Sequence, residues 1–237
     1  MNTVTTELVR AALAAAAEEA SIVVVRASHS TFIQEGADAC AALLDASGDL
    51  IAQSTATSLM HSASLCCTVP ELLRDIPAAT MRPGDVYVTN DPYRGGIHAN
   101  DLVVVRPVFA PDEPPERSGP LFFAGTLIHV ADLGGAVAGG LAAVATDTFH
   151  EGLLLPPVAL ERAGEPVDAV WRILLRNSRT PDAVAGDVRA LIAGTHTLAA
   201  RVEELMGRYD AATVRDVARE WTDYAEVRTR HEIAALP

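Results

Sequence analysis

Two short segments of the sequence carry the residue types that bind metal ions. His98 and Asp101 are three positions apart at the end of a turn-rich loop, and His129 and Asp132 repeat this spacing downstream. Two neutral imidazoles and a carboxylate can hold a divalent ion such as Zn²⁺, Mn²⁺ or Fe²⁺ and leave coordination positions open for water or a substrate. Histidine at this spacing is also common as a hydrogen-bonded core residue. A metal site therefore requires a fold that brings the two segments together.

The residues around these segments predict an antiparallel hairpin that would join them. Leu102–Phe109 and Leu121–Val130 are both strongly β-prone, and the connection between them, Ala110–Pro120, contains four prolines. In an antiparallel hairpin, the start of the first strand lies beside the end of the second. The first His and Asp pair stands at that start, and the second pair stands at that end. We therefore expect the two pairs to converge.

This convergence predicts one divalent metal site with His98, Asp101 and His129 as ligands. Asp132 is either a fourth ligand or an acceptor that orients one of the imidazole rings. His61 is a further candidate for the same pocket.

The remaining sequence predicts an α+β protein of one domain, residues 1–237, with a mixed or antiparallel sheet core, an N-terminal helix and a helical C-terminal end. Residue spacing, turn residues and β-branched runs indicate these further elements: a helix over Thr6–Ala27, a β-hairpin over Ala39–Ser54, a helix over Thr57–Arg74, a strand over Asp85–Thr89, and helices over Ala183–Arg208 and Ala212–Ile233 that separate near Tyr209-Asp210.

Composition excludes several classes of protein. The net charge of -13 argues against nucleic acid or an anionic membrane as a partner, because phosphate backbones require clustered Lys and Arg. No apolar run reaches the roughly 18 residues that a membrane-spanning helix needs. Three cysteines, two of them adjacent, do not form a disulfide framework, so free thiols and a cytoplasmic location are expected.

Several motifs occur together in one order along the chain. They are NDPYRGGIHAND over residues 90–101, HVADLGG over 129–135, EGL over 151–153, NSRTP over 177–181 and GD at 186–187. Together they resemble the hydantoinase B/oxoprolinase family, which includes subunits of ATP-dependent N-methylhydantoinases, 5-oxoprolinase, and acetone and acetophenone carboxylases. The resemblance covers nearly the whole chain and matches the N-terminal half of the usual family length. It therefore implies a split subunit or a truncated product.

The resemblance also implies cofactors and partners. His98, Asp101 and His129 match the positions that bind a divalent metal in the acetone carboxylase branch. A hydantoinase A-like subunit is expected to bind ATP and Mg²⁺ and to phosphorylate the amide or enol oxygen of a small-molecule substrate. A further chain would supply the missing C-terminal half. The sequence itself has no Walker-type GxxxxGK[ST] motif, which agrees with nucleotide binding elsewhere.

Two carboxylates are the candidate catalytic residues. Glu151 is a candidate general base near the metal, although Glu-Gly is also a common turn or cap. Asp132 is the second candidate, and the family order favours a role in orienting a ligand. Asn177 and Arg179 either grip a substrate carboxylate or phosphate, or form a structural salt bridge.

We therefore predict a metal-binding subunit of a heteromeric ATP-dependent enzyme that acts on a carbonyl or a cyclic amide. The reaction is either hydrolysis of a hydantoin, lactam or oxoproline ring, or carboxylation of a ketone. A multi-subunit organisation slightly favours carboxylation. The alternative is a non-catalytic scaffold subunit that completes the complex.

Overall fold

A seven-stranded sheet lies at the centre of the protein in a computed structural model that describes residues 3–36, 38–55, 59–115 and 119–236. The strand order is β2-β1-β5-β4-β3-β6-β7, and each neighbouring pair is antiparallel. The strands are β1 (Ala39–Asp45), β2 (Leu50–Gln53), β3 (Val86–Thr89), β4 (Asp101–Val108), β5 (Phe122–His129), β6 (Val158–Arg162) and β7 (Glu165–Pro166). The predicted α+β class is confirmed, and the sheet is antiparallel rather than mixed.

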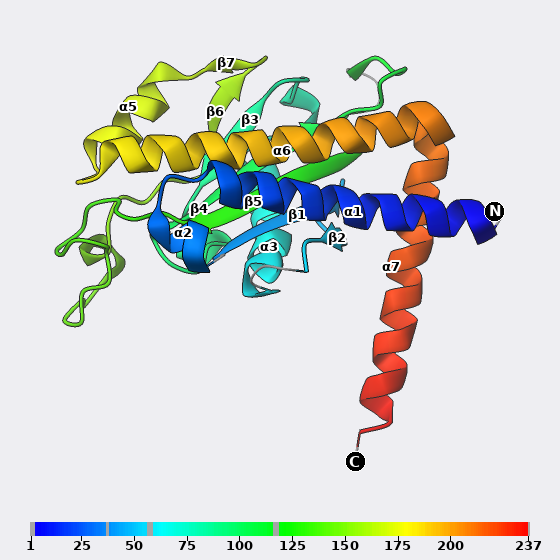
Figure 1. The fold of residues 1–237 in the computed structure, drawn as a ribbon, viewed down its shortest axis with the longest axis horizontal. Coiled ribbons are helices and arrows are strands. Elements are labelled where there is room, and N and C mark those ends of the chain that lie inside the picture. The colour runs from blue at the N-terminus through cyan, green and yellow to red at the C-terminus, as the bar shows by residue number, and fades with distance from the viewer. Residues whose placement is uncertain (1–2, 37, 56–58, 116–118, 237) are drawn as a thin grey trace.

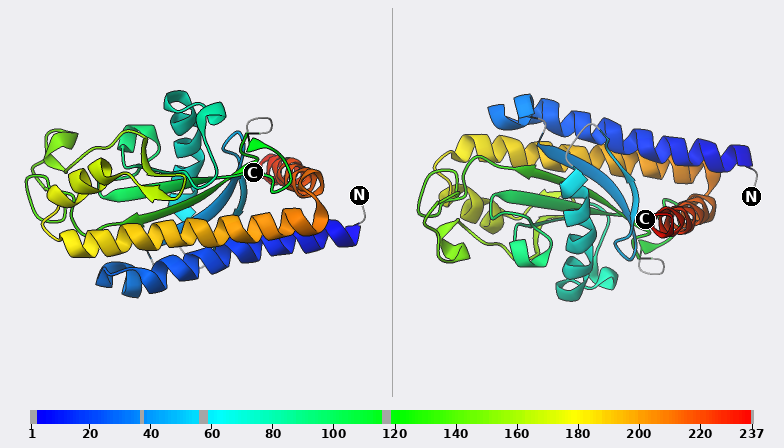
Figure 2. Two further views of the ribbon diagram at one scale, coloured as in Figure 1. Left: turned by 90° about the horizontal axis from the view of Figure 1, so that it is seen from above. Right: turned by 90° about the horizontal axis from the view of Figure 1, so that it is seen from below.

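Helices cover both faces of the sheet. The two long helices α1 (Thr3–Ala27) and α6 (Pro181–Tyr209) lie side by side over one face, and α3 (Leu59–Asp75) packs on the other, as Figure 2 shows. Helix α7 (Ala211–Ala234) leaves the end of α6 and projects away from the sheet (Figure 1). The shorter helices are α2 (Thr31–Gly36), α5 (Asp168–Arg176), η1 (Ala78–Thr80), η2 (Pro92–Arg94) and η3 (Thr148–His150).

The alternation of side chains along β4 explains why its apolar run is continuous. Leu102 and Val104 pack in the cluster under α6, whereas Val103 and Val105 pack in the cluster under α3. All four are buried, because this central strand is covered on both faces. Burial of each such side chain contributes about 1.5–3 kcal/mol to stability. The two layers of helices therefore hold β4 firmly in place.

The break between the last two helices occurs at Asp210, close to the predicted position. This residue has a φ of +63°, which ends α6 because the left-handed region does not continue a right-handed helix. Its carboxylate accepts hydrogen bonds from the Thr213 backbone N–H at 2.7 Å and from the Thr213 hydroxyl at 3.0 Å. Asp210 thus caps the start of α7.

The predicted elements are confirmed, with small shifts at their ends. Helix α1 begins three residues earlier than predicted, and α3 ends at Asp75 rather than Arg74. The predicted start of α3, at residues 57 and 58, lies outside the described residues. Four elements were not predicted: α2, β6, β7 and α5. Among the helices of the described residues, none combines the length and the apolar character needed to cross a membrane.

Candidate metal centre

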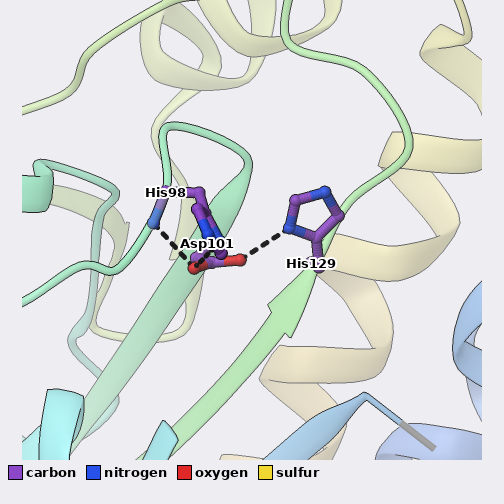
Figure 3. A group of neighbouring side chains, drawn as sticks. All are labelled: His98, Asp101 and His129. Carbon is purple, nitrogen blue, oxygen red and sulfur yellow. Dashed lines mark hydrogen bonds and ion pairs between the residues drawn. The ribbon is translucent and has the colours of Figure 1, made fainter. Parts of the chain in front are cut away.

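The predicted hairpin is confirmed, and it brings the two histidine-containing segments to the same end of the sheet. Strands β4 and β5 pair from Val108 opposite Phe122 to Asp101 opposite His129. His98 lies in the loop that leads into β4, three residues before Asp101. Figure 3 shows the Asp101 carboxylate between the two imidazole rings.

The Asp101 carboxylate is the centre of this group. Its Oδ1 accepts a hydrogen bond from His129 Nδ1 at 2.7 Å. Its Oδ2 accepts hydrogen bonds from the His98 backbone N–H at 2.8 Å and from His98 Nδ1 at 3.1 Å. The two rings lie edge to face, with 5.7 Å between their centroids. Asp101 is fully buried, His129 is half-buried and His98 is exposed, so the group opens to solvent on the His98 side.

The pKa of Asp101 is lowered by its surroundings. Burial alone would raise this pKa, because it removes the charged carboxylate from water. The hydrogen bond and charge of His129, together with the backbone N–H and charge of His98, outweigh that effect. The carboxylate is therefore ionised at neutral pH and is a suitable acceptor or metal ligand.

The loop that carries His98 is held in place by Asn90 and by a glycine. The buried side chain of Asn90 donates to two backbone carbonyl groups and accepts from the Leu155 N–H at 2.6 Å. Gly95 has a φ of +112°, and a Cβ atom there would lie 2.6 Å from the backbone nitrogen of Thr68. Glycine is needed here because the loop rests directly on α3.

His61, in the first turn of α3, lies beside the same group. Its ring is 3% exposed, and Nε2 is 3.5 Å from Asp38 Oδ1. Burial lowers the pKa of His61, an effect that the charges of Asp38 and Asp101 partly offset and that of His129 reinforces. Within the described residues, Nδ1 of His61 is buried and has no hydrogen-bond partner.

The residues present fit a divalent metal ion. His98, Asp101 and His129 each offer one ligand atom, and these atoms lie within 4.8 Å of one another. Metal–ligand bonds to nitrogen and oxygen are about 2.0–2.2 Å long, so small side-chain rotations would bring the three atoms onto one ion. Two imidazoles and one carboxylate suit Zn²⁺, Mn²⁺ or Fe²⁺. The unpartnered nitrogen of His61 adds a further buried polar atom beside the group.

The two predicted catalytic carboxylates lie outside this group of ligand atoms. Both oxygens of Asp132 accept hydrogen bonds from backbone N–H groups and from Arg179, so they are fully engaged elsewhere. Glu151 lies half-buried in the turn after η3, where its backbone contacts Gly135 and Gly140. These contacts favour structural roles for both residues, and the predicted catalytic roles stay predictions.

Arg179 and Asn177 make internal contacts. Arg179 pairs with Asp132 at 2.8 Å, which confirms the structural salt bridge as the better of the two sequence interpretations. The Asn177 side chain donates to the Ile173 carbonyl oxygen at 2.8 Å at the end of α5. The sequence gave no signal for the anchoring role of Asn90, because its partners lie more than 60 residues away.

Comparison with known proteins decides the family. Residues 2–237 match the sequence profile of the family described as hydantoinase B/oxoprolinase. The chain belongs to this family. The resemblance of its motifs is therefore confirmed over nearly the full length of the sequence.

Individual family members show how much of a longer protein the chain represents. Caprolactamase subunit beta of Pseudomonas jessenii is 29% identical over 240 residues, which cover 100% of this chain and 40% of that protein. In the crystal structure of the ATP-dependent caprolactamase from the same organism, the TM-score is 0.88 at 26% identity, with the same coverage. The acetophenone carboxylase delta subunit of Aromatoleum aromaticum is 28% identical over 205 residues, or 84% of this chain and 28% of that protein. The chain thus spans 40% or less of the length of these relatives.

Proposed function

We propose that this chain is the metal-binding subunit of a heteromeric ATP-dependent enzyme that acts on a cyclic amide or another carbonyl compound. The observation that carries the proposal is the convergence of His98, Asp101 and His129 at one end of the β4–β5 hairpin in a member of this family. When bound, a divalent ion would supply Lewis-acid polarisation of the substrate oxygen.

The contribution of the chain itself is to hold the ligand atoms in place. The buried Asp101 carboxylate orients both imidazoles through its two oxygens, and the exposed face of His98 leaves an approach for a small molecule. Asp132 would act by orienting the neighbouring loop, and Glu151 stays the candidate general base. A cytoplasmic location is part of the proposal and is supported by the free state of all three cysteines.

A cyclic amide is the first choice of substrate class. The caprolactamase subunit matches the whole chain, whereas the acetophenone carboxylase subunit matches 84% of it. This difference in coverage supports ring hydrolysis over the ketone carboxylation that subunit organisation had slightly favoured. Partners are also proposed: a hydantoinase A-like subunit that binds ATP and Mg²⁺, and a chain equivalent to the remaining length of the relatives.

Metal analysis of the purified chain tests the site. We expect about one equivalent of Zn²⁺, Mn²⁺ or Fe²⁺ per chain, and loss of most of it in Asp101→Asn, which keeps the side-chain shape but removes the charged ligand. His196→Ala, which replaces an exposed histidine on α6, is the control and should retain the metal. A wild-type chain without stoichiometric metal under metal-replete conditions would refute the proposed site and favour the scaffold alternative.

ATP consumption by the whole complex tests the substrate class. Lactams and hydantoins should stimulate ATP hydrolysis, and ketones with bicarbonate should not. The reverse result would assign the chain to the carboxylase branch. Unchanged activity in the complex that contains Asp101→Asn would identify the chain as a scaffold.

A further inference from the structure

Asp132 is the organising residue of the loop that follows β5. Its Oδ1 accepts hydrogen bonds from the backbone N–H groups of Gly134 at 3.0 Å and Arg179 at 2.8 Å. Its Oδ2 accepts from the Gly139 N–H at 3.0 Å and from Arg179 Nη1 at 2.8 Å. These four donors lower the pKa of Asp132, although burial opposes that effect. One carboxylate thus ties both ends of the loop 134–139 to the segment before α6.

Arg179 completes the closure from the other side. Besides its salt bridge, Nη1 donates to the carbonyl oxygens of Gly134 at 2.9 Å and Val137 at 3.2 Å, and Nη2 donates to the Gly135 carbonyl oxygen at 2.8 Å. A planar guanidinium can satisfy several acceptors at fixed angles in this way, whereas a lysine ammonium is a point charge on a flexible stem. Arg179 therefore fixes the backbone of the loop as well as the charge of Asp132.

The closed loop is joined directly to the candidate metal ligands. Gly139, which donates to Asp132, accepts a hydrogen bond from Asn100 Nδ2 at 2.8 Å. The Asn100 carbonyl oxygen accepts from the Val130 N–H at 2.9 Å. Asn100 precedes Asp101 and Val130 follows His129, so this bond extends the pairing of the two ligand-bearing strands by one residue pair.

We propose that Arg179, through Asp132, is a positioning residue for the metal centre: it closes the loop 132–140 and so sets the relative placement of His129 and Asp101. This inference rests on the proposed function for its biological meaning, but its physical content concerns the metal-free chain. Loss of the guanidinium would release the carbonyl groups of the loop, loosen Gly139 and weaken the anchoring of Asn100. The ligand-bearing ends of both strands would then become less ordered.

The chain offers a matched control at the other end of the sheet. Arg162 Nη1 pairs with Asp85 at 3.0 Å, and that carboxylate also accepts backbone hydrogen bonds. The exposures are closely similar: 49% and 3% for the Arg162–Asp85 pair, against 46% and 3% for the Arg179–Asp132 pair. Arg162→Met and Arg179→Met therefore remove equivalent ion pairs, and only the second pair adjoins the candidate centre.

The experiment compares these two variants in the isolated chain. Arg179→Met should speed amide hydrogen exchange of residues 134–140 and shift the ring-nitrogen NMR signals of His129, whereas Arg162→Met should leave both unchanged. The Kd for Mn²⁺ or Zn²⁺ alone, measured by titration calorimetry, should rise about tenfold in Arg179→Met, as expected for loss of an outer-shell partner. Arg179→Lys should restore only part of each effect, because it keeps the charge and loses the fork. If Arg179→Met does not fold, Arg179→Lys carries the comparison.

The outcomes separate this inference from the proposed function. If exchange and the His129 signals respond alike in the variants at positions 179 and 162, the positioning role is wrong. If the wild-type chain binds neither metal, the proposed metal function fails, yet the exchange and NMR results still decide whether Arg179 positions His129. A selective response at position 179 with weakened metal binding supports both.

Discussion

Burial gives the histidines around the candidate centre different chemical roles. His98 is exposed and faces solvent, which suits a group that meets an ion or a substrate. His61 is buried close to Asp38, and burial favours its neutral form. Only a neutral imidazole offers a nitrogen lone pair, so the buried position keeps His61 an acceptor at neutral pH.

The depressed pKa of His61 predicts a pH-dependent stability. The folded state binds a proton less readily than the unfolded state, so this contribution is fully present above the unfolded pKa of about 6.5 and is lost as the pH falls through the folded pKa. Urea unfolding should therefore show that the free energy of unfolding falls from pH 7 to pH 5 less steeply in His61→Gln than in the wild type. His196→Gln, at an exposed position, is the control. Equal slopes for His61→Gln and the wild type would contradict the prediction.

The ligand residues of the site could be predicted from the sequence, but their surroundings could not. His98, Asp101 and His129 were found because a single local hairpin suffices to bring them together. The engagement of Asp132 depends on Arg179, which is 47 residues away and approaches only after α5 and α6 have packed. Hydrogen bonds of this kind have no local sequence pattern, so the direction in which Asp132 points was open.

At the scale of elements, the prediction succeeded where periodicity or turn chemistry is strong. Long helices such as α1 and α6 and the hairpin β4–β5 repeat their pattern over many residues. The missed elements α2, β6, β7 and α5 have nine residues or fewer, and β7 has only two. Such short segments form because β3 supplies an edge for β6 and α6 supplies a surface for α5. Tertiary contacts, rather than local propensity, specify them.

The packing of α6 against α1 predicts opposite effects for two glycines of the same helix. A Cβ atom at Gly194 would lie 2.4 Å from Val24 Cγ2 and 3.1 Å from Thr126 Cγ2, so Gly194→Ala should destabilise the protein by about 1–3 kcal/mol through overpacking. A Cβ atom at Gly207 would meet nothing within 4 Å, so Gly207→Ala should stabilise it by about 0.5–1 kcal/mol. Thermal or chemical denaturation measures both. Stabilisation by Gly194→Ala would show that α6 can move away from the sheet at little cost.

At the scale of the whole molecule, α7 is the element with the fewest internal contacts per residue. Its first half buries Val214, Val217 and Ala218 against the body of the protein. From Asp223 to Leu236 every residue is exposed, and Figure 1 shows this half projecting alone. A helical segment of about a dozen residues without tertiary contacts is only marginally stable in water. The remaining length of the relatives offers a chain that could pack here, in agreement with the proposed partners.

Hydrogen exchange should therefore divide α7 into two halves. In the isolated chain, amides of residues 223–236 should exchange rapidly, whereas those near Val217 should be protected by the core. In a complex with the proposed partner chains, we expect the distal amides to gain protection, because packing removes the open states through which exchange occurs. The amides of α6 serve as the internal control, since α6 is packed against α1 and the sheet and should be protected in both samples. Strong protection of residues 223–236 in the isolated monomer would mean that this half is stable by itself, and unchanged rapid exchange in the complex would place the partner interface elsewhere on the surface.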